Sequence, residues 1–200
     1  MIKIKMCGMC RPDDIEYANL VHPEYVGYIF APSSKRYISH ETAAQFTRQL
    51  DKNIIPVGVF KDEDVQVVTE IVNSGSIRMI QLHGNENDDY ITDLREQVDL
   101  PIIKAFKIRN ANDVKAAKSS AADMILLDSG EGSGELFDHS LLENISRPYF
   151  LAGGLDEDNI GSILNVLSPY AVDVSSGIEL NGNKQLKRMQ AFANAVRRKQ

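Results

Sequence analysis

The feature that most constrains the fold of this chain is a regular recurrence of short apolar runs. They lie at residues 2–6, 25–30, 55–60, 79–83, 102–106, 124–128, 149–152 and 171–174, and β-branched residues are frequent in them. Each run ends 22 to 30 residues after the previous one, which leaves room for one helix and two short loops. Strands joined by such long connections run parallel, because an antiparallel pair needs only a tight turn.

The segments between these runs have the pattern of amphipathic helices. Val65, Val68 and Ile71 fall on one stripe, and Leu186, Met189, Phe192, Ala193 and Val196 form another near the end of the chain. Ser39 and Asp156 are candidate N-caps, and Pro12 suits a first helical turn. Eight β-then-α units predict an α/β fold, a single-domain (β/α)8 TIM barrel over residues 1–200.

An open doubly wound sheet is the competing architecture. Its dinucleotide-binding form carries G-x-G-x-x-G after the first strand, whereas this chain reads Cys7-Gly8-Met9-Cys10 there. A length of 200 residues with 43% hydrophobic content fits one domain.

Charge and cysteine content restrict the partners and the compartment. The net charge is -6 and no basic stripe is present, so nucleic acid and anionic membranes are poor partners. No run reaches the ~18 apolar residues of a membrane span, and the first residues do not have the pattern of a secretory signal. With only two closely spaced cysteines, we expect a cytoplasmic protein. We also expect it to bind a small-molecule sugar phosphate and to be a monomer or a homodimer.

Polar residues gather where the predicted strands end. Reactive groups of (β/α)8 barrels lie at the carboxyl ends of the strands. The residues found there are Cys7, Arg36, Gln81, His83, Asp128, Gly153, Gly154, Asp173, Ser175, Ser176 and Gly177. A packing requirement does not explain this concentration, so we expect them to surround one active site.

The loops after the seventh and eighth strands have the composition of a phosphate site. Gly153-Gly154 and Ser175-Ser176-Gly177 allow main-chain N–H groups to approach an anion closely. Barrels of this kind often bind phosphate with these two loops. The alternative is that they are ordinary turn glycines.

Cys7 and Asp128 are the candidate acid–base pair. Strand parity places Lys5 on the same face as Cys7, and a nearby ammonium would lower the pKa of the thiol. Asp128 follows an apolar run, and partial desolvation there would favour its protonated form. The alternatives are a buried structural thiol for Cys7 and an N-cap or salt-bridged carboxylate for Asp128. One C-x-x-C pair supplies too few ligands for a structural zinc, so no metal is expected.

The remaining candidates are open in role. Arg36 has the shape to hold a carboxylate through two parallel hydrogen bonds, or it is a solvated loop charge. Asp173 either orients substrate hydroxyls or pairs with an interior lysine. Gln81 and His83 are expected at the rim of the site, with a structural histidine as the alternative.

Taken together and in order, these segments resemble the phosphoribosylanthranilate isomerase family of tryptophan biosynthesis. The matching stretches run from Lys5-Met6-Cys7-Gly8 through Gly27-Tyr28-Ile29-Phe30-Ala31-Pro32, Ser34-Lys35-Arg36-Tyr37, Gln81-Leu82-His83-Gly84 and Leu127-Asp128-Ser129 to Leu151-Ala152-Gly153-Gly154-Leu155 and Asp173-Val174-Ser175-Ser176-Gly177-Ile178-Glu179.

The resemblance implies a set of roles. Cys7 matches the general base of the family and Asp128 its general acid. Arg36 matches the residue that holds the anthranilate carboxylate, and Gly154, Ser176 and Gly177 match the phosphate loops. The implied reaction is the Amadori rearrangement of N-(5-phosphoribosyl)anthranilate to 1-(2-carboxyphenylamino)-1-deoxyribulose 5-phosphate, without a cofactor. We also expect residues 129–134, a Gly/Ser-rich stretch, to form a loop that closes over the site.

The chain departs from the family pattern in two places. Cys10 stands where a threonine is expected, and Gln185 replaces an aspartate. Rival interpretations are a related phosphate-binding barrel, such as indole-glycerol-phosphate synthase or a histidine-pathway isomerase, and a barrel that only binds a sugar phosphate. An indole-glycerol-phosphate synthase would need a catalytic lysine pattern that this chain lacks. A histidine-pathway isomerase pairs two aspartates, whereas position 7 here is a cysteine. A barrel that only binds a sugar phosphate would not need Cys7 and Asp128 together.

Overall fold

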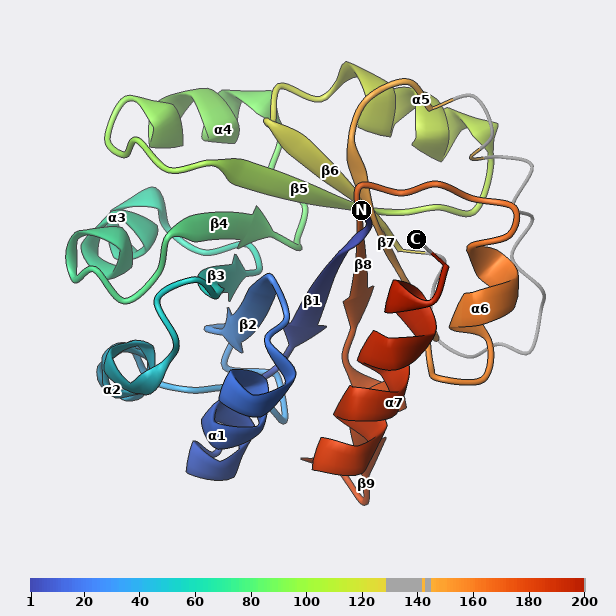
Figure 1. The fold of residues 1–200 in the computed structure, drawn as a ribbon. Helices are drawn as coiled ribbons and strands as arrows, with labels where there is room; N and C mark the ends of the chain where they lie inside the picture. Colours follow the sequence, from blue (N-terminus) through green and yellow to red (C-terminus); the bar gives the residue numbers. More distant parts are fainter. Residues whose placement is uncertain (129–141, 143–144, 200) are drawn as a thin grey trace.

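The chain folds into a closed barrel of eight parallel strands in chain order (Figure 1). The computed structural model describes residues 1–128, 142 and 145–199. The strands are β1 (Lys3–Cys7), β2 (Tyr25–Ile29), β3 (Ile55–Phe60), β4 (Met79–Leu82), β5 (Ile102–Lys107), β6 (Met124–Asp128), β7 (Tyr149–Ala152) and β8 (Ala171–Val174). β8 pairs with β1 and completes the ring, so the predicted barrel is confirmed against the open sheet.

Helices surround the barrel on its outside, as Figure 1 shows. They are α1 (Pro12–Val21), α2 (His40–Gln49), α3 (Val65–Asn73), α4 (Asp88–Arg95), α5 (Ala111–Ser119), α6 (Ile160–Ile163) and α7 (Leu186–Arg197). After β8 the chain forms the 3-10 turn η2 (Ser176–Ile178) and a small hairpin of β9 (Glu179–Leu180) and β10 (Asn183–Lys184). The connection from β6 to β7 lies almost wholly outside the described residues.

The local signals in the sequence placed most element ends correctly. Pro12 is in the first turn of α1, and the Ser39 side chain accepts a hydrogen bond from the backbone N–H of Thr42 as the N-cap of α2. The prediction for Asp156 was wrong, because the N-cap of α6 is Asn159. The Asp156 carboxylate instead accepts hydrogen bonds from the N–H groups of Asp158 and Asn159 in the preceding turn.

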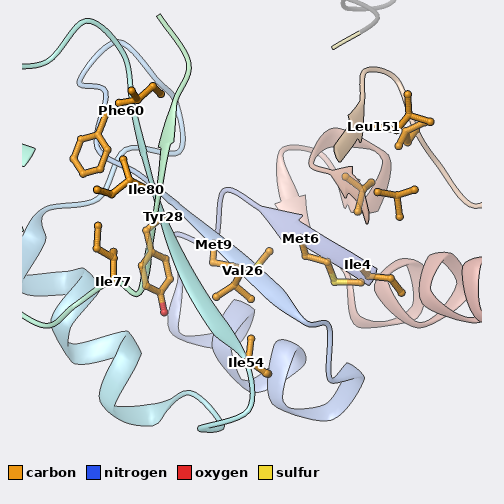
Figure 2. Close-up of a cluster of buried hydrophobic side chains, with 14 of the residues drawn as sticks. Ile4, Met6, Met9, Val26, Tyr28, Ile54, Phe60, Ile77, Ile80 and Leu151 are labelled. Carbon is orange, nitrogen blue, oxygen red and sulfur yellow. The ribbon is translucent and has the colours of Figure 1, made fainter. Parts of the chain in front are cut away.

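Two apolar layers arise from the alternation of side chains along each strand. Figure 2 shows part of the outer layer, in which Ile4 and Met6 of β1, Val26 and Tyr28 of β2 and Ile80 of β4 are buried. The intervening residues fill the barrel with a second cluster: Tyr25, Val57, Met79, Ile103, Ala105, Leu126, Phe150, Ala152 and Ala171. The polar residues at the strand ends lie directly above this inner layer.

Candidate active site

Strand parity aims the candidate residues into one opening. On β1 the inner positions are Lys3, Lys5 and Cys7, since Ile4 and Met6 belong to the outer layer. Asp128 lies two residues after Leu126 of the inner cluster on β6, and Asp173 lies two residues after Ala171 on β8. Because parallel strands end at the same side of the barrel, these polar side chains share its carboxyl-terminal mouth.

A cavity of about 400 Å³ occupies this mouth. Ten of the eleven residues predicted for the site line it: Cys7, Arg36, Gln81, His83, Asp128, Gly153, Gly154, Asp173, Ser175 and Ser176. Gly177 is the exception. A Cβ on this glycine would overlap the carbonyl oxygen of Leu155, so Gly177 allows the loops after β7 and β8 to approach each other rather than facing the cavity.

A buried ion pair lies beneath Cys7. The Lys5 ammonium donates to both carboxylate oxygens of Asp173 at 3.0 Å, across the β1–β8 register that pairs these two residues. Lys5 is fully buried. A methyl group on Gly27 of β2 would crowd Sγ of Cys7 and Nζ of Lys5 at once, so this glycine leaves room for both. Of the two roles left open for Asp173, pairing with an interior lysine is observed.

Two opposing influences act on the thiol. Burial raises the pKa of Cys7 above its ordinary value, and the Lys5 ammonium counteracts this shift. The expectation that lysine lowers the pKa is right about the direction of its effect, but burial is the larger influence. Cys7 as a whole residue is 7% exposed. It therefore loses its proton less readily than a free cysteine, and its ionisation depends on the lysine below.

Asp128 and His83 face each other across the mouth. Nε2 of His83 is 3.8 Å from Oδ2 of Asp128, and Nδ1 lies 2.8 Å from the amide nitrogen of Gln81. Because this amide nitrogen donates, Nδ1 accepts and the ring proton is assigned to Nε2, on the side of Asp128. Burial lowers the pKa of His83, which favours the neutral ring. Gln81 is itself buried, and its Oε1 has no hydrogen-bond partner among the described residues.

Arg36 reaches the cavity from the loop after β2. Its Nε and Nη2 donate to the two carboxylate oxygens of Glu179, at 2.6 and 2.7 Å. Gly8, with φ of +80°, gives the arginine its place, since a Cβ there would overlap Cδ of Arg36. Arg36 is thus a fixed part of the cavity wall and not a solvated loop charge.

The two candidate phosphate loops form a further part of the wall. Gly153 and Gly154 have φ of +101° and +59°, in the left-handed region that glycine adopts without strain. On the β8 side, the Ser175 hydroxyl donates to the carbonyl oxygen of Cys7 at 3.0 Å, which ties this loop to the end of β1. These loops place glycine- and serine-containing backbone on the cavity wall, where main-chain N–H groups are candidate donors for an anion.

Sequence reasoning missed several residues of this region. Ser33, Ser34 and Lys61 line the cavity, and Glu179 and Lys184 support its wall from behind. The signal for the last two was present, because Asn181-Gly182 is the dipeptide typical of a tight hairpin. Residues 129–134, expected as a closing loop, lie outside the described residues.

The described residues hold neither a metal-binding cluster nor a membrane-spanning helix. Over residues 1–128, 142 and 145–199, no three His, Cys, Asp or Glu side chains gather in a way that could hold a metal ion. No helix in the described part of the chain is both long enough and apolar enough to cross a membrane.

The matching family model and the curated relatives name one family. The family model for N-(5'-phosphoribosyl)anthranilate isomerase (PRAI) matches residues 4–195. A curated relative of that name from Endomicrobium trichonymphae is 39% identical over 194 residues, which cover 94% of this chain and 95% of the relative.

Solved structures agree with this assignment. The crystal structure of phosphoribosyl anthranilate isomerase from Thermotoga maritima superposes with a TM-score of 0.91 at 32% identity, covering 98% of this chain and 99% of that one. A phosphoribosyl anthranilate isomerase in complex with reduced 1-(o-carboxyphenylamino)-1-deoxyribulose 5-phosphate has a TM-score of 0.88 at 31% identity, with the same coverage. On this likeness of sequence and fold over nearly its whole length, the chain belongs to the N-(5'-phosphoribosyl)anthranilate isomerase family.

Proposed function

We propose that this mouth catalyses the Amadori rearrangement of N-(5'-phosphoribosyl)anthranilate to 1-(2-carboxyphenylamino)-1-deoxyribulose 5-phosphate, with Cys7 as general base and Asp128 as general acid. As a member of its family, the chain is an isomerase of tryptophan biosynthesis. The observation that carries the assignment of roles is one cavity lined by a thiol, a carboxyl group, an arginine and two glycine- and serine-containing loops. A base, an acid and anchors for two anions thus meet around one substrate-sized space.

Asp128 begins the reaction as the acid. It gives its proton to the ring oxygen of the furanose, the C–O bond breaks, and the sugar opens to a protonated Schiff base. The carboxylate left behind faces Nε2 of His83 at 3.8 Å. An N–H on that side favours the new negative charge. Gln81 sets this orientation of the ring through its bond to Nδ1.

Cys7 completes the rearrangement as the base. Its thiolate takes the proton from C2, the electron pair moves into the C1–C2 bond, and the resulting enolamine tautomerises to the ketose. Electrons move only between two carbons of the substrate, so no external oxidant is required. The nearby Lys5 ammonium favours the thiolate against the effect of burial.

Anchors at both ends would hold C2 against the base. Main-chain donors around Gly153, Gly154, Ser175 and Ser176 are proposed to bind the phosphate, and Gly177 lets these two loops approach each other. Arg36 is proposed to hold the carboxylate of the anthranilate ring. The buried Oε1 of Gln81 offers an acceptor for a sugar hydroxyl. Two-ended binding of this kind is a major source of rate, because it fixes the reacting atoms.

The direct test follows the loss of substrate fluorescence on addition of the protein and of two variants, Cys7→Ala and Asp128→Asn. Each variant should lose about 10²–10⁴-fold in kcat, the usual value of one positioned proton transfer. The matched control is Cys10→Ala, a half-buried cysteine three residues away that does not line the cavity. Substantial turnover by Cys7→Ala in a folded protein would refute the role of the thiol.

Substrate anchoring is tested separately with Arg36→Met. This variant should raise KM far more than it lowers kcat, and an unchanged KM would remove Arg36 from the site. We further expect the enzyme to act in the cytoplasm as a monomer or a homodimer. Light scattering after size-exclusion chromatography would decide between the two assemblies.

A further inference from the structure

A cluster of three charges stands behind the wall of the cavity. Arg36 uses its Nε–Nη2 edge for the two oxygens of Glu179. A guanidinium group has five N–H donors in one plane. The bond to Glu179 therefore leaves Nη1 and the second hydrogen of Nη2 for another acceptor. Because Arg36 lines the cavity, a carboxylate bound there would find this second edge.

The position of Glu179 is set by the β9–β10 hairpin. Asn181 and Gly182 have φ of +53° and +78°, which identifies a two-residue turn of type I′. The register pairs Glu179 with Lys184 directly across the hairpin. Side chains opposite each other in an antiparallel pair lie on one face, so the turn brings this acid and this base together.

Lys184 is an unusual residue to find in this place, because it is only 2% exposed. Its ammonium donates to Oε1 of Glu179 at 2.7 Å, to the carbonyl oxygen of Ser175 at 2.9 Å and to its hydroxyl at 3.3 Å. All three N–H donors are therefore used. Burying a cation is costly unless it is paired, so its presence calls for a partner that must stay ionised.

The charge count shows what Lys184 contributes. Arg36 and Glu179 alone would be a neutral pair, and a second carboxylate brought to Arg36 would meet the repulsion of Glu179. With Lys184 the three side chains carry one net positive charge. The chain as a whole has a net charge of -6, so its overall field does not attract an anion.

We propose that Glu179 and Lys184 are positioning residues, which hold the free edge of Arg36 toward the cavity and keep the cluster cationic, so that it binds the aryl carboxylate of the substrate. This inference rests on the proposed function and deepens it. Glu179 fixes the geometry of the guanidinium, and Lys184 offsets the charge of Glu179. Through Ser175, the same lysine also links the carboxylate end of the cavity to the loop that is proposed to bind phosphate.

The test measures binding rather than turnover. Calorimetry gives the Kd of reduced 1-(o-carboxyphenylamino)-1-deoxyribulose 5-phosphate and of the same compound with a plain phenyl ring. The ratio of the two values reports recognition of the carboxylate alone. For the wild type we expect a clear preference for the carboxylated compound.

Three variants separate charge from geometry. Lys184→Met should weaken binding of the carboxylated compound by about tenfold or more, while the phenyl compound changes little. Glu179→Gln adds positive charge but loses the charge-assisted grip on Arg36, so it should also weaken the preference. The double variant Glu179→Gln/Lys184→Met carries the wild-type net charge and should bind the carboxylated compound more tightly than Lys184→Met.

The outcomes that overturn the inference are distinct from those that overturn the proposed function. Equal losses for both compounds would mean that the hairpin only supports the loops, and tighter binding by Glu179→Gln would mean that charge alone matters. Either result refutes the positioning role. Arg36→Met is the reference. If Arg36→Met keeps the preference for the carboxylated compound, the proposed role of Arg36 itself is wrong. If Arg36→Met loses this preference while the Glu179 and Lys184 variants keep it, only the inference is refuted.

Discussion

At the scale of single residues, the site depends on contacts that allow no extra atom. Gly8 illustrates this, because its φ is positive and the space beside it is filled by the alkyl chain of Arg36. The arginine is therefore held on one side by the backbone at the end of β1 and on the other by Glu179. A side chain at position 8 should therefore displace the guanidinium group of Arg36.

Gly8→Ala should weaken substrate binding as well as stability. The backbone conformation costs a non-glycine residue about 1–2 kcal/mol, and the added methyl group displaces Arg36. We expect KM to rise by roughly tenfold, the loss of about one charged hydrogen bond. Gly75→Ala is the matched control, with φ of +72° and nothing within 4 Å of the new Cβ. It should lose similar stability in urea unfolding and keep its KM; equal changes in KM would contradict the contact argument.

The proposed role of Cys7 as the base sets the expected pH dependence of the reaction. Only the thiolate accepts a proton, and burial raises the pKa of this thiol, so kcat/KM should rise with pH on the alkaline side of the ordinary cysteine value. Lys5→Met removes the nearby positive charge, which makes the thiolate less stable. The rise should therefore move to higher pH. Asp173 acts on the thiol in the opposite direction with a smaller effect.

The control for this experiment is Lys3→Met. Lys3 lies two residues earlier on the same inner face and donates to the Tyr170 hydroxyl at 2.6 Å, away from the thiol. Its variant should leave the pH profile in place. Ultraviolet titration of the thiolate in a Cys10→Ser background reads the same pKa without turnover. A profile that does not move in Lys5→Met would show that the lysine has no influence on the base.

At the scale of elements, two loops form one wall because their backbones touch. Gly177, at the start of the chain segment after β8, is in contact with the carbonyl oxygen of Leu155 after β7. No side chain fits between them. This close approach, which also involves Asp156, restricts the relative position of the two proposed phosphate loops.

Gly177→Ala should separate these loops and weaken binding of the reduced product analogue by about tenfold or more, equal to about one lost hydrogen bond to a charged group. Gly161→Ala in α6 is a suitable control, since the nearest atom to its new Cβ is Cε of Lys199 at 3.8 Å. That variant should keep the wild-type Kd measured by calorimetry. An unchanged Kd for Gly177→Ala would show that the loops adjust without loss of the anion site.

The same scale explains what could be predicted from the sequence. Strand ends are encoded locally by apolar runs and turn residues, so Cys7, Asp128 and Asp173 were placed at the mouth from parity and spacing alone. The pairing of Arg36 with Glu179 could not be predicted in this way, because the two residues are 143 positions apart in the chain. The Asn181-Gly182 signal predicts a hairpin, but only the closed barrel shows that it lies behind Arg36.

The sequence also could not predict whether burial or the Lys5 ammonium has the larger effect on the pKa of Cys7. Parity placed Lys5 next to the thiol, and this was confirmed. Whether the ammonium or the burial has the larger effect depends on how completely the barrel closes above and below the sulfur. That is a property of packing in three dimensions and not of the spacing along β1.

At the scale of the whole molecule, the barrel separates stability from chemistry along its axis. At the amino-terminal ends of the strands, Tyr25 packs edge-on against Phe150 with ring centroids 5.4 Å apart, and its hydroxyl lies 3.1 Å from that of Tyr170. Lys3 donates to this pair. The proposed active site lies at the opposite ends of the same strands, where the cavity interrupts the packing.

Tyr25→Phe tests this division. The ring and its contact with Phe150 remain, and only the buried hydroxyl is lost, which should cost about 1 kcal/mol in unfolding and lower Tm by about 2–4 °C. Because Tyr25 begins β2 while the cavity lies beyond its end, kcat/KM should stay at the wild-type value. Cys7→Ala should behave in the reverse way, losing turnover while its Tm stays close to that of the wild type. If Tyr25→Phe lowers kcat/KM tenfold, the lower layer must be coupled to the mouth through the intervening Lys5–Asp173 pair, and the two ends of the barrel could not be treated as independent.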